Sequence, residues 1–405
     1  MIKNERHDSL SKRKKILKLG YFISISLVFL FLLKPAITQL IPLRNLSSVD
    51  SEIRLVVKQK RNRLFSLKYQ DQLPYKIVIN GKEETYSYFK CYELNEEKNN
   101  ITLKFNTQVK SCESMFESSN DILEIDLSDF DMTQVTSMEN IFKESNDLEY
   151  VNFTNINLPK VENFSYMFFN LKKLKSIDLS NLYFPKVKDM KYMFAKCTDL
   201  TSVNLYNLNL PNIKDMQSIF YYCENLIYVN LTNINISSVE DISSSFSRCF
   251  KLKSIDLSNL NLPNCKKLSG MFNIYRGLEY VNLTNIKLPS VEDMDKLFFQ
   301  KETLISIDLI NSDFSNVKYM GRMFEGCYKL KYVNLTNINL SSVEDMSNFF
   351  YNCFRLISID LSNLYLPNLK YMGLMFFDCY NLVYVNLTNT NISSVEEYVR
   401  FFLLL

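Results

Sequence analysis

A short apolar and polar motif recurs along most of the chain at a fixed interval. Val333 in "YVNLTN" and Ile359 in "SIDLSN" lie 26 residues apart. The same step separates the members of the whole series, which are Ile125, Val151, Ile177, Val203, Val229, Ile255, Val281, Ile307, Val333, Ile359 and Val385. A second column keeps this phase, at Phe116, Phe142, Phe168, Phe194, Phe220, Phe246, Phe272, Phe298, Phe324, Phe350, Phe376 and Phe402. Two columns with one period predict a solenoid whose turns bury their apolar faces against each other.

Each repeat divides into three predicted pieces. In the repeat that starts at Leu174, Ile177 and Leu179 alternate with polar residues, which predicts a short strand with these apolar side chains facing inward. Pro185 ends a second extended piece, because proline cannot donate to a ladder. Helical spacing follows at Val187, Met190, Phe194 and Cys197. The predicted fold class is therefore α/β, with a parallel strand, an extended corner and a short helix in each turn.

This repeat pattern is similar to a known family. The segment 174–200, "LKSIDLSNLYFPKVKDMKYMFAKCTDL", resembles the BspA-like leucine-rich repeats of surface proteins from bacteria and microbial eukaryotes. The resemblance implies a leucine-rich-repeat solenoid of about eleven turns over residues 109–405, with a role in adhesion or macromolecular recognition. The chain departs from the pattern at Tyr275 and Lys301, where the cysteine column fails, and at Ser245, where a methionine is lost.

The chain before the repeats is predicted to hold further parts. Period-two alternation over 46–108, with Asn80-Gly81 as a hairpin signal, predicts a small β-rich module that caps the open end of the stack. Residues 1–15 form a basic tail, and 16–38 contain an uncharged apolar run. This run predicts a transmembrane anchor or a signal peptide, with a buried core helix as the alternative. The basic flank predicts a cytoplasmic tail and repeats outside the cell or in a lumen, or a secreted protein after cleavage.

Two polar columns alternate in charge along the predicted stack. No two aspartates are adjacent in the outward strand column Asp126, Asn152, Asp178, Asn204, Asn230, Asp256, Asn282, Asp308, Asn334, Asp360 and Asn386. A second column alternates Glu and Lys from Glu162 to Glu396, except at Lys188 and Lys214. Because stacked strands lie about 4.8 Å apart, we expect amides and ammonium groups to separate the carboxylates and hold the register. A repetitive cation-binding face is the alternative.

Asparagine and cysteine columns also have structural interpretations. Asparagines at the turn that leaves the strand, from Asn155 to Asn389, are expected to form an amide ladder, with a sugar-binding row as the alternative. Six cysteines share one core-facing position of the repeat and have no CxxC spacing, so we predict that they are buried free thiols. They are Cys197, Cys223, Cys249, Cys327, Cys353 and Cys379. For Cys91 and Cys112, a disulfide between them is the alternative to free thiols.

Composition argues against an enzyme. The 405 residues carry 47 Lys and Arg against 44 Asp and Glu, so the formal net charge of +3 indicates no nucleic-acid partner. The single histidine, His7, lies in the N-terminal tail, and the seven glycines supply no phosphate-binding loop. We therefore predict no catalytic residues, no cofactor and no bound metal.

The outward strand face is the predicted binding surface, because a sheet of Tyr, Asn, Asp, Ser and Thr suits adaptable polar contacts. The candidate residues are Tyr228, Asn230, Tyr280, Asn282, Tyr332, Asn334, Asp360 and Tyr384. We expect a protein or glycan ligand for a surface-displayed protein, and the alternative is an intracellular or lumenal scaffold without an adhesive role. The sequence stops inside the twelfth predicted helix, at Leu405, which predicts exposed apolar surface and homotypic association.

Overall fold

The computed structural model describes residues 51–396 apart from 59–60, 63, 86–91 and 274–275. All of these residues belong to one compact unit, Ser48–Leu405. Within these ranges no helix has the length and apolar character needed to cross a bilayer. The predicted tail, the predicted transmembrane or signal segment and the last residues of the chain lie outside the described residues.

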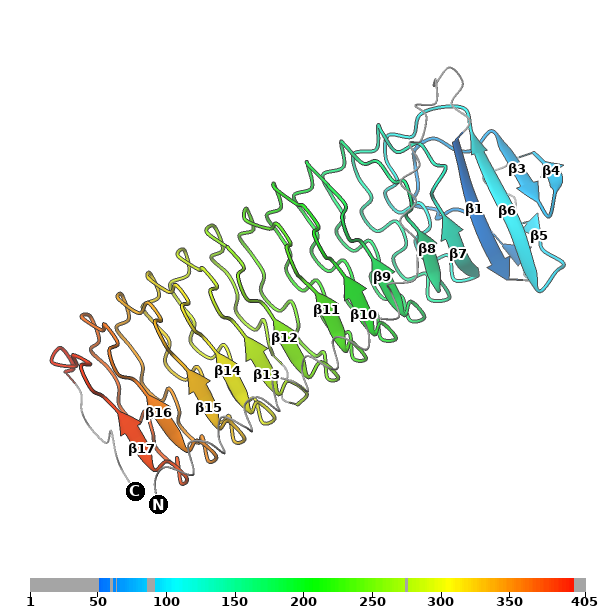
Figure 1. Cartoon of the computed structure of the whole chain (residues 1–405). Coiled ribbons are helices and arrows are strands. Elements are labelled where there is room, and N and C mark those ends of the chain that lie inside the picture. The colour runs from blue at the N-terminus through cyan, green and yellow to red at the C-terminus, as the bar shows by residue number, and fades with distance from the viewer. Residues whose placement is uncertain (1–50, 59–60, 63, 86–91, 274–275, 397–405) are drawn as a thin grey trace, which may run out of the picture. The chain divides into compact units, whose positions relative to one another are not determined.

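The N-terminal part is a mixed β-sheet that continues into the repeats (Figure 1). Its strand order is β4-β3-β6-β1-β7-β8, and only the pair β7 and β8 is parallel. The bounds are β1 (Ser51–Lys58), β3 (Lys76–Ile79), β4 (Lys82–Glu84), β6 (Lys98–Phe105), β7 (Ile122–Asp126) and β8 (Tyr150–Asn152). A separate short ladder pairs β2 (Arg61–Asn62) with β5 (Tyr92–Glu93). The predicted hairpin forms between β3 and β4, where Asn80 and Gly81 both have positive φ.

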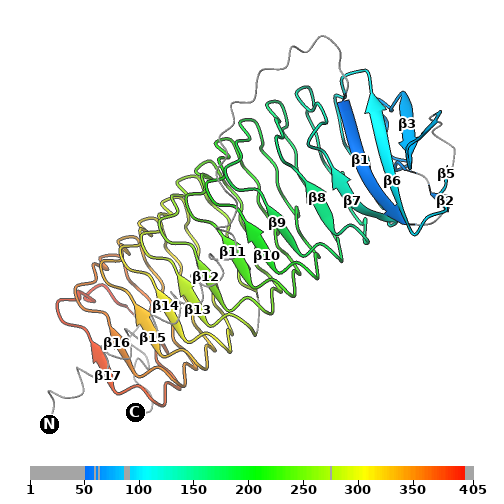
Figure 2. The same ribbon diagram turned by 45° about the vertical axis from the view of Figure 1, so that its right-hand side comes forward.

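The repeats form a parallel β-solenoid in which β7 to β17 lie side by side in a row (Figures 1 and 2). From Ile125 in β7 to Val385 in β17 the chain covers 260 residues, which is ten steps of 26. Pairing is in register, so that Val203 lies opposite Val229. The remaining strands are β9 (Ser176–Asp178), β10 (Ser202–Asn204), β11 (Tyr228–Asn230), β12 (Ser254–Asp256), β13 (Tyr280–Asn282), β14 (Ser306–Asp308), β15 (Tyr332–Asn334), β16 (Ser358–Asp360) and β17 (Tyr384–Asn386).

The prediction of a short helix in each turn is wrong for the repeats that the structure describes, where tight turns occupy those segments. The backbone amides alternate between two kinds of acceptor. Ser218 and Tyr222 have positive φ and donate to the carbonyls of the next repeat, whereas Ile219 donates to Met216 in its own repeat. Left-handed residues four positions apart interrupt the dihedral angles and the hydrogen bonds of an α-helix. The spacing of 3 and 4 residues therefore reflects consecutive turns that bury the same face.

A continuous stack of phenylalanine rings runs through the core from Phe116 to Phe376. Neighbouring rings have centroids 5.2 to 6.2 Å apart and are nearly parallel. Phe65 of the N-terminal part stacks on Phe116 at 5.6 Å, which extends the row beyond the first repeat. Aromatic contacts at this separation add to the free energy of apolar burial. The row thus joins the N-terminal sheet to the solenoid by side chains as well as by strand pairing.

Asparagine amides form ladders along the stack, as the sequence predicts. Asn285 donates to Asn259 at 2.9 Å, and Asn311 donates to Asn285 at 3.1 Å. Every asparagine of this column also has positive φ, between 54° and 63°. Asparagine tolerates the left-handed region better than most residues. The column therefore satisfies a backbone requirement in addition to forming the ladder.

The charged columns pair between neighbouring repeats. In the strand column, the Asn204 amide donates to Asp178 at 3.1 Å, and Asn230 donates to Asn204 at 3.0 Å. In the second column, Lys188 pairs with Glu162 at 2.8 Å and Lys214 pairs with Glu240 at 2.9 Å. Lys188 and Lys214 stand in adjacent repeats, and each pairs with the glutamate in the repeat that does not carry the other lysine. Hydrogen bonds from the lysines lower the pKa of both glutamates.

A cavity of about 60 Å³ lies in the core next to Ser245, where neighbouring repeats carry Ile219 and Met271. We expect Ser245→Met to fill this space and to raise the free energy of unfolding by about 1 kcal/mol. Urea denaturation of the two proteins measures the difference. Met193→Ser, which opens the same kind of space elsewhere, is the control and should destabilise the fold. A lower denaturation midpoint for Ser245→Met would show that the site is already filled.

Replacing Asn204 and Asn230 together by Asp would place carboxylates on four adjacent strands, from Asp178 to Asp256. We expect the free energy of unfolding to fall by about 1 to 2 kcal/mol at neutral pH and low salt, because like charges directly opposite repel. Replacing both by Ser removes the amides without adding charge and should cost less. Melting temperatures at low and high salt check this, and an unchanged melting temperature at low salt contradicts the proposed role of the column.

Candidate functional site

The tyrosines of the predicted binding face differ in exposure. Tyr228, Tyr332 and Tyr384 are 49%, 52% and 59% exposed. Tyr280 is only partly exposed, and its hydroxyl donates to Asp308 at 2.8 Å. Burial and this hydrogen bond raise the pKa of Tyr280. Three of the four predicted tyrosines thus present their rings to solvent, and the fourth is held by its neighbour.

The predicted asparagines and the aspartate have structural partners. The Asn230, Asn282 and Asn334 side-chain oxygens accept hydrogen bonds from the backbone N–H two residues later, at 3.0 to 3.2 Å. Asp360 accepts the same bond from Ser362 at 2.9 Å, and hydrogen bonding by the side chain and the backbone of Ser362 lowers the pKa of Asp360. Such side-chain turns fix the chain where it leaves the strand. These four residues lie on the predicted face, but their oxygens shape the backbone.

An aliphatic column next to the tyrosines was not among the predicted site residues. From β8 to β17, the residue before the strand is aliphatic in four repeats, at Ile227, Ile305, Ile357 and Val383. In the other repeats it is Glu149, Lys175, Thr201, Lys253, Glu279 and Lys331. Ile357 and Val383 are exposed, and the Val383 amide donates to the Ile357 carbonyl at 2.9 Å. Aligning this column across the repeats would reveal the aliphatic residues, three of which lie in the last four repeats, from β14 to β17. We name Tyr332, Tyr384, Ile305, Ile357 and Val383 the late strand face.

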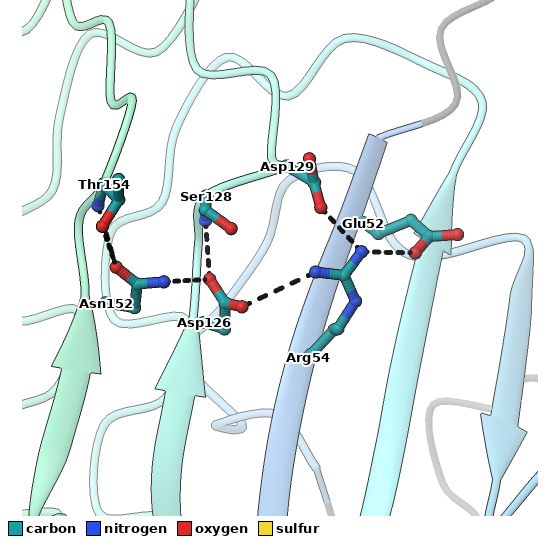
Figure 3. Close-up of polar contacts among 7 residues, drawn as sticks. All are labelled: Glu52, Arg54, Asp126, Ser128, Asp129, Asn152 and Thr154. Carbon is teal, nitrogen blue, oxygen red and sulfur yellow. Dashed lines mark hydrogen bonds and ion pairs between the residues drawn. The ribbon is translucent and has the colours of Figure 1, made fainter. Parts of the chain in front are cut away.

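A second polar site forms where the N-terminal sheet meets the first repeat (Figure 3). Arg54 of β1 contacts Asp129 at 2.6 Å, Glu52 at 3.3 Å and Asp126 of β7 at 3.6 Å. Asn152 of β8 donates to Asp126 at 2.9 Å. The hydrogen bond to Asp129 raises the pKa of Arg54. Sequence periodicity could not indicate this arrangement, because it needs an antiparallel strand beside the repeats.

The same junction is hollowed. A cavity of about 360 Å³ lies over β6, β1, β7 and β8. Its polar lining includes Arg54, Asn100, Thr102, Glu124, Asp126, Tyr150 and Asn152. Asp126 keeps a lowered pKa because hydrogen bonds from Ser128 and the charge of Arg54 outweigh the effect of burial. We name this hollow the junction pocket.

The cysteines are buried, as predicted. Cys197, Cys223, Cys249, Cys327, Cys353 and Cys379 donate to the carbonyl of a phenylalanine in the preceding repeat, at 2.9 to 3.2 Å. Burial raises the pKa of these thiols, to about 12 for Cys197. Cys112 is free and buried, and Cys91 lies outside the described residues. The thiols are therefore part of the core.

Other titratable groups depart from the repeat pattern. Lys301 stands in the cysteine column, is 4% exposed and donates to the Phe299 carbonyl at 2.6 Å. Burial lowers the pKa of Lys301 to about 8.

Asp189, Asp215 and Asp241 are neighbours across three repeats, and burial raises the pKa of Asp215. Among the described residues, no three His, Cys, Asp or Glu side chains are arranged to hold a metal ion.

Solved structures similar to the chain include the Toll and Spatzle complex of Drosophila, with 19% identity, a TM-score of 0.35 and coverage of 62% of this chain and 31% of that chain. The TLR13 complex with ssRNA13 has 13% identity, a TM-score of 0.27 and coverage of 70% and 66%. The functional domain of InlJ from Listeria monocytogenes has 14% identity, a TM-score of 0.21 and coverage of 73% and 66%. The chain thus spans less than two thirds of each, and at these scores none bears on what it binds. No curated protein matches the chain.

One protein family matches most of the chain. Its description is Mycoplasma protein of unknown function, DUF285, and the matches cover residues 85–207, 188–306 and 266–389. These ranges overlap and together include all the strands from β7 to β17. The match agrees with a repeat solenoid, and it does not confirm the BspA-like name. The chain belongs to the family of Mycoplasma proteins of unknown function, DUF285.

Proposed function

We propose that the chain is a surface-displayed recognition protein that binds a macromolecular partner through the outward strand face. The observation that carries the proposal is the late strand face. There, half-exposed tyrosine rings repeat at every second strand and lie next to exposed aliphatic side chains. Tyrosine offers a large rigid contact surface with a polar tip, which suits the centre of a protein interface.

The surroundings of these side chains also fit an interface. Ser306 and Ser358 occupy the tyrosine column in the intervening strands, and Thr336 and Thr388 follow the strands on the same side. An apolar and aromatic centre with a polar rim is the usual composition of a recognition surface. Eleven strands at about 4.8 Å give a row about 50 Å long, which is long enough for a standard interface.

Surface display is the part of the proposal that depends on sequence alone. It rests on the basic tail 1–15 and the apolar run within 16–38, which are typical of an anchor or a signal peptide. The competing function is an intracellular or lumenal scaffold that uses the same face. Since both functions need the strand face, cellular location must be tested separately.

The strand face can be tested by exchanging tyrosine for the residue that the same column carries elsewhere. We expect Tyr228, Tyr332 and Tyr384, all replaced by Ser, to weaken binding of the labelled full chain to host cells or immobilised matrix proteins at least about tenfold. Serine is already present at Ser202, Ser254, Ser306 and Ser358. Tyr183→Asn and Tyr365→Asn alter exposed tyrosines outside this column and are the matched controls.

Equal binding by the triple variant and the control would overturn the role of the strand face. Location is measured by treating intact cells that express an epitope-tagged chain with an external protease. Removal of the repeats supports surface display. Protection until the cells are permeabilised contradicts it and favours the scaffold.

A further inference from the structure

We propose that the junction pocket binds one ring of a neutral saccharide. This inference rests on the proposed recognition function and names a ligand class for a second position on the same sheet. The pocket lies at the N-terminal end of the strand row, several repeats away from the late strand face. The two surfaces can therefore be tested independently.

The hollow arises from strand register. Val56 of β1 lies opposite Asn100 of β6 on one side and opposite Glu124 of β7 on the other. Glu124 in turn lies opposite Tyr150 of β8. Side chains directly opposite in a sheet are about 4.5 to 5.5 Å apart at Cβ, so the short valine leaves a depression between longer neighbours. The register shifts between Val56 and Val57 because Leu123 of β7 is an extra residue, and this bulge bends β7 at this point.

The groups around this depression have unused hydrogen-bonding capacity. Within the described residues, the side chains of Asn100, Thr102, Glu124 and Tyr150 have no hydrogen-bond or ion-pair partner. They offer amide and hydroxyl donors, carboxylate and carbonyl acceptors and one half-exposed aromatic ring. A pyranose presents the matching set, with hydroxyls that both donate and accept and an apolar C–H face that packs on an aromatic ring.

Charge disfavours an anionic ligand. Arg54 is the guanidinium in the pocket lining, and it already contacts Glu52, Asp126 and Asp129. It is therefore not available for an incoming anion, and the unpaired Glu124 carboxylate repels one. Acidic sugars and phosphate groups are disfavoured for this reason.

A cationic peptide side chain is the competing ligand, because it could lie on the Tyr150 ring beside Glu124. An ammonium or guanidinium group has no acceptor, so such a cation would leave the Asn100 amide N–H and the Thr102 hydroxyl proton without a partner. A ring with several hydroxyls uses all four groups. The cavity volume of about 360 Å³ is also at the small end of ligand pockets, which fits a single ring.

The arrangement is specific to the junction. In later repeats the tyrosine column is bordered by parallel strands that place serine beside it, as Ser202 lies beside Tyr228. Only at β7, among the described repeats, does an antiparallel strand bring valine, asparagine and threonine to the repeat sheet. The saccharide site is thus expected once, at the first turn.

The test uses the full chain and a panel of soluble probes. These are the methyl glycosides of glucose, galactose, mannose and N-acetylglucosamine, with free sialic acid and a lysine-containing tripeptide for comparison. Saturation-transfer-difference NMR detects weak binding of each probe. We expect at least one neutral glycoside to bind, and Tyr150→Ser and Glu124→Ala each to lower its affinity at least about tenfold.

Tyr183→Ser is the matched control, since it makes the same exchange at an exposed tyrosine that lies outside both the pocket and the tyrosine column of the strand face. Neutral glycoside binding that persists in this control and falls in Tyr150→Ser supports the proposal. The proposal is overturned if no neutral glycoside binds, if binding survives both pocket variants, or if only sialic acid or the tripeptide binds. Binding of cells or matrix through the late strand face is unaffected by those outcomes, so the two proposals fail separately.

Discussion

The fold depends on backbone hydrogen bonds that connect each repeat to the next at the same place in every turn. Ser218 donates to Ser243 and Phe220 donates to Ser245, so every second amide in this segment is satisfied by the neighbouring repeat. A single repeat would leave these groups without partners, and buried polar backbone groups without partners are costly. The constant step of 26 residues is the geometric condition for this bonding, because an added residue would shift every later column.

The side-chain columns follow from that condition. Once equivalent positions are stacked, each residue type meets copies of itself or of its counterpart in the next turn. Phenylalanine and asparagine suit this arrangement because rings stack and amides both donate and accept. Carboxylates do not, which is why Asp178 is followed by Asn204 and Glu162 by Lys188. The run of Asp189, Asp215 and Asp241 is the exception, and there burial, together with the charges of Asp189 and Asp241, raises the pKa of Asp215.

Much of this architecture could be predicted from the sequence, because a strict period reports stacking directly. The strand positions, the inward and outward residues, the amide ladder and the buried thiols all follow from columns such as Val203, Asn285 and Cys197. The helix prediction failed for a physical reason. Spacings of 3 and 4 are shared by helices and by consecutive turns, and apolar periodicity carries no sign of φ at residues such as Tyr222.

The candidate sites were less accessible to sequence reasoning. The tyrosines of the strand face could be identified, but the internal bonds of Tyr280 and Asn334 could not. The junction pocket combines β1, β6, β7 and β8, whose pairing joins residues far apart in the chain. Such a site has no period and no motif. It becomes visible only when the antiparallel register of β1 is known.

The alternating charge columns have a consequence for how such a chain can change in length. Inserting or deleting one repeat preserves the backbone bonds and the aromatic row, yet it places like charges side by side at the new junction. Depending on the repeat, these are Asp beside Asp with Lys beside Lys, or Glu beside Glu. Away from the adjacent Asn204 and Asn230, inserting or deleting two repeats preserves the alternation in both columns. Duplication and loss within the gene should therefore be tolerated best in pairs of repeats, which would allow the reach of the strand row to vary among copies while the first turn stays the same.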